Sequence, residues 1–323
     1  MWLDKLQLNP LNTLLNCSNP AIDYFTRKDL LEEKVAKINT LWELPAPKKI
    51  INKQQDDGFW KYPGGNHKLR STEDYNQLET FRQLGELVEK YGFHKDHPSI
   101  EKAAEFLFKC QTSEGDFRGI YGKQYAPTYS SAIMELLIKS GYHDDPRIEK
   151  GFKWLLSHRQ NDGGWAIPFR TLKINYTDSL KLPRPLPSDP SKPFSHLITG
   201  MVLRAFAAHP EYHQSPDAHY AGKLLMSRFF QRDKYNDRKD KKYWESVSFP
   251  FWFTNIVTSL DSLYFLGFKK EEPQIKLALD WLAQQQTTDG TFNLKLLMIR
   301  DKDLIYWVTL AICRIFKRYY NNE

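Results

Sequence analysis

The stretch Pro146–Trp165, PRIEKGFKWLLSHRQNDGGW, decides the fold because the same element occurs three times. It stands without a gap at Pro98–Phe117 (PSIEKAAEFLFKCQTSEGDF) and at Pro273–Phe292 (PQIKLALDWLAQQQTTDGTF). Each copy begins with Pro, has Ile two residues later and ends in Gly-x-aromatic. The chain is therefore a repeat protein, and such units bury their apolar faces by packing on one another.

Each copy predicts a helix followed by a tight turn. Pro146 suits the first helical turn, where its missing N–H has no intrahelical partner. Ile148, Trp154 and Leu155 fall at helical spacing and form one apolar face. The helix is expected to stop at the Asp-Gly or Glu-Gly, where glycine adopts the left-handed conformation. The aromatic residue after the glycine is expected to fold back as a hydrophobic clamp.

A second helix is predicted upstream of each copy. The Gly-aromatic pairs that precede the copies are Gly92-Phe93, Gly141-Tyr142 and Gly267-Phe268, and the helical stretches before them are Glu73–Tyr91, Pro127–Ser140 and Pro250–Leu266. The repeating unit is therefore an αα-hairpin.

Further copies are degenerate or incomplete. Pro216–Tyr235 has the same length, with Asp233 in place of the glycine, and Ser195–Ala208 is its expected upstream helix. The turn Gln54–Trp60 closes a helix that starts near Lys48. The last helix is expected at Asp303–Tyr320. Together with the three clear copies, these segments predict an all-α protein of five hairpins, and a helix around Ala21–Leu31 is a candidate for a sixth.

The closing turns resemble a known repeat. Gln54-xxx-Gly58-x-Trp60, Gln111-xxx-Gly115-x-Phe117 and Gln286-xxx-Gly290-x-Phe292 are similar to the Gln/Trp repeat of terpenoid cyclases and protein prenyltransferase β-subunits, which also carries the prenyltransferase/squalene oxidase label. Arg159 occupies the Gln position of the copy ending at Trp165, and Gln160 is shifted by one. The resemblance implies a single α/α toroid, an inner ring of helices around a central cavity with an outer ring around it. The start, Asn19–Phe25 and Lys28–Leu31, looks like that of stand-alone bacterial and archaeal toroids.

Length and composition agree with one domain over residues 1–323, comprising an N-terminal helical segment, 1–47, and a repeat region, 48–320. No apolar run approaches the length of a membrane span. Met1–Cys17 lacks the features of a signal peptide, and three widely spaced cysteines do not suggest a disulfide framework. We therefore expect a cytoplasmic protein. The sequence leaves the oligomeric state open.

The net charge of +7 is partly local, as in the mixed-charge run Arg232–Lys242. Nucleic-acid binding requires a basic stripe with stacking aromatics, which the sequence lacks. Weak peripheral contact with an anionic membrane surface remains compatible with the charge.

The catalytic motifs that the resemblance implies are missing. There is no Asp-x-Asp-Asp acid motif of proton-initiated cyclases, and Asp144-Asp145 and Asp56-Asp57 are interpreted as caps in turns. The Asp-Asp-x-x-Asp motif of ionising terpene synthases is also absent. Cys110 and Cys313 do not suggest the zinc site of prenyltransferases. No metal and no cofactor are predicted.

The remaining candidates are polar and aromatic residues expected on inner helices. Candidate catalytic residues are Asp74, His196 and Asp261. Candidate ligand-binding residues are Tyr75, Gln77, Tyr129, Ser130, Trp252, Asn255, Tyr306 and Trp307. Aromatic rings lining a cavity stabilise carbocations or bind apolar ligands, but the same rings are equally expected in a packed core.

One column of acids recurs. Glu86, Glu135 and Asp261 each lie six residues before a hairpin glycine. A catalytic acid is usually singular, so repetition favours a structural role in pairing with Lys or Arg. This interpretation competes with the catalytic one at Asp261.

Two long connections interrupt the repeats. Ala166–Pro193 contains the Pro-rich loop 183–193, which is semi-rigid and is expected either as a lid across the cavity mouth or as a plain surface crossing. Residues 236–249 form a similar excursion, and Trp60–Ser71 is a Gly/Pro loop that leads into the first inner helix.

Three functions fit these observations. The first is a toroid without the known catalytic motifs that binds an apolar, isoprenoid-like small molecule. The second is a divergent enzyme of terpenoid or prenyl transfer, or a carbohydrate-active toroid by fold analogy alone. The third is an interaction scaffold.

Overall fold

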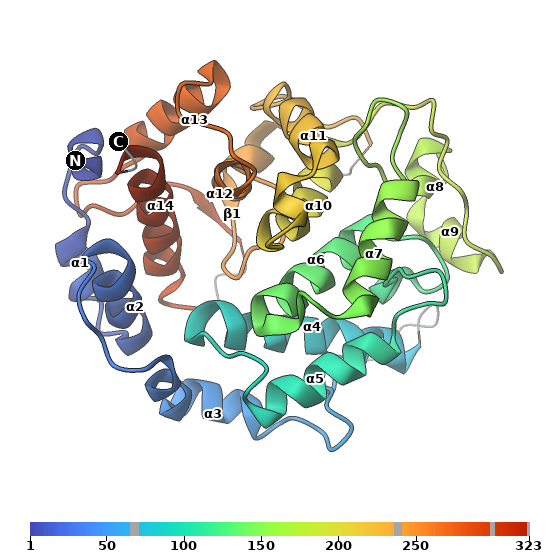
Figure 1. Cartoon of the computed structure of the whole chain (residues 1–323), viewed down its shortest axis with the longest axis horizontal. Coiled ribbons are helices and arrows are strands. Elements are labelled where there is room, and N and C mark those ends of the chain that lie inside the picture. The colour runs from blue at the N-terminus through green and yellow to red at the C-terminus, as the bar shows by residue number, and fades with distance from the viewer. Residues whose placement is uncertain (65–70, 236–240, 298–300, 322–323) are drawn as a thin grey trace.

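The computed structural model describes residues 1–64, 71–235, 241–297 and 301–321. The loop Trp60–Ser71 and the excursion 236–249 therefore lie partly outside the described residues. In the described part, helices are arranged around a short strand, β1, that lies near the middle of the molecule (Figure 1). The predicted all-α fold is confirmed.

Two rings of helices make up the fold. The inner helices are α2 (Pro20–Phe25), α4 (Thr72–Tyr91), α6 (Pro127–Leu137), α10 (His196–Ala208), α12 (Ile256–Phe265) and α14 (Leu304–Tyr320). The outer helices are α1 (Leu11–Leu15), α3 (Pro45–Ile51), α5 (Pro98–Lys109), α7 (Pro146–Ser157), α11 (Pro216–Met226) and α13 (Pro273–Gln284). Each inner helix contacts the next, and α14 contacts α2, so the inner ring is closed.

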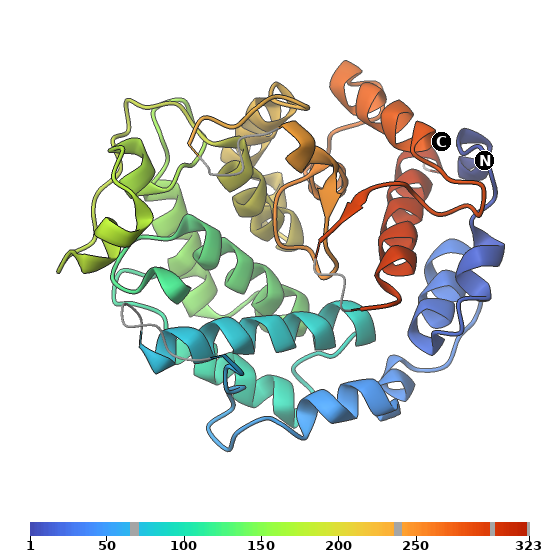
Figure 2. The ribbon, with the colours of Figure 1, turned by 180° about the vertical axis from the view of Figure 1, so that it is seen from behind.

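Short elements complete the chain. They are the helices α8 (Pro168–Thr171) and α9 (Tyr176–Lys181), the parallel strands β1 (Ser246–Val247) and β2 (Lys295–Leu296), the 3₁₀ helices η1 (Trp2–Lys5), η3 (Ile38–Glu43), η4 (Gly119–Tyr121), η6 (Tyr212–Gln214) and η7 (Lys241–Glu245), and the π-helical turns η2 (Thr26–Leu30) and η5 (Ile138–Tyr142). In both views, α8 and α9 lie at the outer edge of the molecule (Figures 1 and 2). The Ala166–Pro193 excursion thus does not place these helices over β1 at the centre.

The repeated glutamine joins each closing turn to the next outer helix. The Gln111 side chain donates to the carbonyl oxygens of Gly115, in its own turn, and Arg147, at the start of α7, both at 2.8 Å. Gln54 and Gln286 make the same kind of paired contact. The Gln/Trp repeat is therefore the element that fixes the spacing of neighbouring hairpins.

The copy that ends at Trp165, in which Arg159 occupies the glutamine position, makes this contact differently. Arg159 forms an ion pair of 2.5 Å with Asp217, at the start of α11. The shifted Gln160 donates instead to the carbonyls of Asp189 and Lys192, at 2.6 and 2.9 Å. The shift thus anchors the end of the long excursion while Arg159 keeps the link to the next outer helix.

The sixth pair is assembled from both ends of the described chain. Gln286 accepts a hydrogen bond from the Leu8 N–H at 2.8 Å and donates to the Leu8 carbonyl at 2.9 Å. α1 contacts α14 and thereby takes the outer position beside it. The helix predicted around Ala21–Leu31 does belong to a sixth pair, as α2 and η2.

One predicted helix is too long. The helix expected at Pro250–Leu266 begins only at Ile256, because Asn255 and Thr258 form a reciprocal capping box there. Residues 249–254 are not helical and lie among the inner helices instead. This difference decides how the centre of the ring is filled.

Candidate functional site

An aromatic segment of the chain fills the centre of the ring. We call Phe249–Phe253, sequence FPFWF, the central segment. Its Trp252 packs against Phe81 of α4 and Tyr129 of α6, with ring centroids 5.1 and 5.3 Å apart. Its Phe249 stacks on Trp307 of α14 at 5.4 Å. The segment therefore bridges inner helices that are far apart in sequence.

The central segment is not wholly buried. Phe251, Trp252 and Phe253 are each half-buried, whereas Phe249 is 6% exposed. β1 precedes the segment and pairs with β2 in parallel register, Ser246 with Lys295. Aromatic surface thus stays accessible beside a fixed backbone.

A buried ion pair holds the backbone of this segment. Arg204 of α10 donates to the carbonyls of Phe251 and Trp252, at 2.9 and 3.2 Å. It also pairs with Glu135 of α6 at 2.7 Å, and both side chains are less than a tenth exposed. Lys139 contacts the other carboxylate oxygen of Glu135 at 2.8 Å.

The charge state of Glu135 follows from these contacts. Burial alone would raise the pKa of Glu135, but the charges of Arg204 and Lys139 outweigh it and lower the pKa below its ordinary value. Glu135 is therefore a carboxylate that accepts hydrogen bonds, and it is not poised to donate a proton.

The recurring acids all face basic side chains. Glu86 pairs with Lys90 at 2.7 Å, Glu135 pairs with Arg204, and Asp261 pairs with Arg318 of α14. Glu135 and Asp261 thus each link two inner helices, whereas Glu86 links two turns of α4. Asp261, a candidate catalytic residue, is engaged in this contact.

Two other candidates serve as helix caps. Asp74 and Ser71 form a reciprocal capping box at the start of α4, with hydrogen bonds of 2.9 and 3.0 Å. Asn255 does the same for α12 with Thr258. Both side chains satisfy N–H groups that a helix start leaves without partners.

Three candidates make their contacts with closing turns, a loop or an outer helix. The Ser130 hydroxyl accepts the N–H of Phe117 and lies 3.0 Å from its carbonyl, so it fixes a closing turn. Tyr75 stacks on Tyr62 at 4.7 Å. Gln77 makes a side-chain hydrogen bond with the thiol of Cys110, whose pKa burial raises to about 12.

The structure therefore brings together only some of the candidates. Tyr129 and Trp252 meet in the centre, and Trp307 reaches the same segment through Phe249. Tyr306 is half-buried at the start of α14. Sequence reasoning missed Arg204, because its role depends on a carboxylate and two carbonyls that are distant in the chain.

His196 lies in a buried polar cluster at the start of α10. Its ring stacks on Trp244 at 4.7 Å, and its Nδ1 lies 3.5 Å from the Asp233 carboxylate. The Ser195 hydroxyl donates to Asp233 at 2.9 Å. It also caps α10 by accepting the Ile198 N–H. Because Asp233, and not His196, contacts the serine, the cluster lacks the order of a serine–histidine–acid triad.

The pH dependence of stability is expected to report on His196. Burial lowers its pKa to about 4, partly opposed by Asp233. The unfolded chain therefore binds a proton that the folded chain does not between about pH 6.5 and 4. Stability should fall by about 1 kcal/mol per pH unit as pH drops through this window. Urea unfolding at several pH values should show this loss in the wild type and a flatter profile in His196→Gln. Parallel profiles would contradict the assignment.

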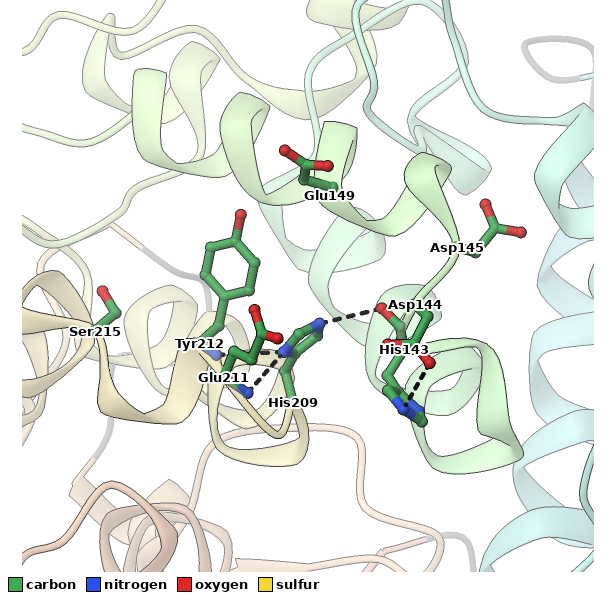
Figure 3. Close-up of a pocket in the computed structure, with 8 residues that line it drawn as sticks. All are labelled: His143, Asp144, Asp145, Glu149, His209, Glu211, Tyr212 and Ser215. Carbon is green, nitrogen blue, oxygen red and sulfur yellow. Dashed lines mark hydrogen bonds and ion pairs between the residues drawn. The ribbon is translucent and has the colours of Figure 1, made fainter.

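A separate pocket of about 520 Å³ lies at the turn before α7 (Figure 3). It is lined by His143, Asp144, Asp145, Glu149, His209, Glu211, Tyr212 and Ser215. Asp145 caps α7, as expected, whereas the exposed Asp144 contacts His143.

One of the two histidines in this pocket, His209, is engaged by main-chain groups. His209 Nδ1 accepts the N–H groups of Glu211 and Tyr212, and its Nε2 lies 3.1 Å from the carbonyl oxygen of His143. Burial lowers the pKa of His209. Among the described residues, no group of His, Cys, Asp and Glu is placed to hold a metal ion.

Comparisons with known proteins agree with this architecture. Residues 70–179 match the family model of the squalene-hopene cyclase C-terminal domain. A squalene–hopene cyclase of Bradyrhizobium diazoefficiens is 30% identical over 145 residues, 39% of this chain and 21% of that protein. One from Schizosaccharomyces japonicus is 35% identical over 57 residues, 18% of this chain and 8% of that protein. The matches thus span about a fifth or less of these relatives.

A solved polysaccharide lyase has the same fold. The match covers 100% of this chain and 98% of the lyase chain, at a TM-score of 0.51 and 12% identity. This likeness concerns the fold alone. The closed double ring of paired helices defines the protein as an α/α toroid. With the sequence matches over part of the chain, this fold is like that of the terpenoid cyclase-like α/α toroids. In the described part of the chain, no helix is both long and apolar enough to cross a bilayer.

Proposed function

We propose that the protein binds an elongated apolar, isoprenoid-like molecule at the centre of its helical ring. The observation that carries this proposal is the partly exposed aromatic surface of Phe251, Trp252 and Phe253, backed by Phe81 and Tyr129. Aromatic faces give large apolar contact area and attract polarisable chains. The ligand lies against these exposed faces.

The ligand class is supported by the relatives. Their names refer to squalene and hopene, which are isoprenoid hydrocarbons. Such a molecule needs apolar contacts and few polar groups, which is what the central segment offers.

The ligand is bound and not chemically converted. Proton-initiated cyclisation needs a carboxylic acid that is protonated and faces the ligand. Glu135, the acid that pairs with the arginine holding the central segment, is kept ionised by two cations. Asp74 is a helix cap and Asp261 pairs with Arg318.

Binding of farnesol, followed by quenching of tryptophan fluorescence, tests the proposal. Trp252→Ala removes the central aromatic surface and should weaken binding about 30-fold, the effect of a binding residue worth ~2 kcal/mol. Tyr220→Ala is the matched control, because Tyr220 is 54% exposed on the outer helix α11. Organic extraction of the purified protein should release a bound apolar molecule.

Three results would count against the proposal. If farnesol does not bind and the organic extract contains no apolar molecule, the protein has no ligand of this class. If Trp252→Ala and Tyr220→Ala change the farnesol affinity equally, farnesol binds away from the central segment. A new product after incubation with squalene or prenyl diphosphates would instead make the protein a divergent enzyme.

A further inference from the structure

A second pocket, of about 480 Å³, lies between the 166–193 excursion and the segment that follows α11. Its lining residues are Arg170, Thr171, Lys173, Ile174, Asn175, Lys192, Lys234 and Tyr235. Four of these residues are basic, and none of the described lining residues is acidic. The lining is therefore unlike that of the aromatic centre.

The excursion as a whole is basic. Residues 166–193 contain the basic residues Arg170, Lys173, Lys181, Arg184 and Lys192 and the acidic residues Asp178 and Asp189, a net charge of +3 out of +7 for the chain. Asp178 contacts Lys181 at 3.0 Å and also accepts a hydrogen bond from the side chain of Asn175, a lining residue. The two acids are each paired with one lysine of the excursion, which still leaves the segment with an excess of positive charge.

The backbone holds the lysines in fixed places. Lys173 adopts φ of +60° at the end of α8, where its N–H donates to Arg170 and the next N–H donates to Phe169. Lys234 follows Asp233, whose carboxylate is held by the buried Ser195 hydroxyl. Two charged side chains from separate segments therefore converge on one pocket.

Three carboxylates lie near the pocket and are already engaged. Together with burial, which is the main cause, Asp162, Asp233 and Asp189 raise the pKa of Tyr235 to about 12. Asp162 accepts main-chain N–H groups at 3.2 and 2.8 Å, and Asp233 accepts the Ser195 hydroxyl.

Asp189 is engaged in the same way. It accepts from the main chain and hydroxyl of Ser191, and it lies 3.6 Å from Lys192. Lys192 is thus partly neutralised, which leaves Lys173 and Lys234 as the lysines that chiefly make the pocket positive.

We propose that this pocket binds a phosphate or diphosphate group. Several cations around one cavity suit a compact, multivalent oxyanion, since each ammonium or guanidinium donates charge-assisted hydrogen bonds to it. The group is carried either by a free phosphate compound or by a lipid headgroup. The inference is independent of apolar binding at the ring centre.

The test is titration of the full chain with inorganic pyrophosphate in a calorimeter at low and high salt. Wild type should bind one equivalent, more weakly as salt screens the charges. Lys173→Gln/Lys234→Gln should bind at least ~10-fold more weakly, because two positive charges are removed near the anion.

The control carries the same charge change elsewhere. Lys153→Gln/Lys276→Gln replaces two lysines on outer helices, 70% and 66% exposed, each paired with an acid four residues away. It should bind pyrophosphate like wild type, and thermal melting checks that both variants fold.

A parallel arm separates the two sources of the anion. Vesicles of phosphatidylcholine with phosphatidylserine replace pyrophosphate in a sedimentation assay. If the protein binds vesicles but not pyrophosphate, and only the pocket variant loses vesicle binding, the site binds lipid headgroups. Binding of neither probe, or equal weakening of both variants, overturns the proposal.

Discussion

Replacing Glu135 with Gln is expected to lower the free energy of unfolding by about 3–5 kcal/mol, the usual effect of removing one partner from a buried ion pair. Arg204 would keep only neutral acceptors, the amide oxygen of the new glutamine and the carbonyls of Phe251 and Trp252, in a nearly water-free site. Lys139 would retain Glu89, 2.6 Å away, so most of the loss falls on Arg204.

The measurement is urea unfolding at pH 7, followed by circular dichroism. Tryptophan fluorescence reports in addition on the packing of Trp252, because the arginine fixes the backbone of that residue. The change should shift this signal even in the folded state.

A double variant provides the control. In Glu135→Gln/Arg204→Met no unpaired charge is left buried, so part of the lost stability should return. The central segment would still lack its backbone donor, and the fluorescence shift should persist. A loss below about 1 kcal/mol in the single variant would show that water reaches Arg204.

The repeat could be predicted because its signals are local. Pro146, the glutamine–glycine turn and the aromatic clamp each depend on neighbours within a few residues. The closing aromatics are buried as expected: Phe117 and Trp165 are both 0% exposed. Repetition made these local signals unambiguous.

The centre of the ring could not be predicted for the opposite reason. Pro250 has the form of a helix start, but the capping box at Asn255 begins the helix later. What draws the intervening aromatics inward is their burial against Phe81 and Tyr129, together with Arg204. None of these partners is near in sequence.

Candidate residues failed to converge on one site for a related reason. A residue's position on an inner helix does not decide whether it faces the centre or the outer layer. Ser130 and Tyr129 are adjacent, yet the hydroxyl bonds the Phe117 turn while the ring reaches Trp252. Rotation about the helix axis separates neighbours by about 100°.

Gly58→Ala is expected to destabilise the protein by about 3 kcal/mol or more, through two effects that add. Gly58 has φ of +90°, which costs a non-glycine residue ~1–2 kcal/mol. An added Cβ would also lie 2.2 Å from the carbonyl oxygen of Lys102 in α5. Because that neighbour is backbone, the outer helix would have to move, at an overpacking cost of about 1–3 kcal/mol.

Gly267→Ala isolates the first effect. Gly267 has a similar φ of +86°, but a Cβ there meets nothing within 4 Å. Its replacement should cost only about 1 kcal/mol, since restricting the unfolded chain offsets part of the strain. Urea unfolding of the two variants therefore separates backbone conformation from contact. A larger loss for Gly58→Ala shows that the repeat keeps its glycine because each turn packs directly on the next outer helix. Equal losses would mean that the turn conformation alone requires it, and that the hairpins are spaced by the Gln54 side chain without help from this contact.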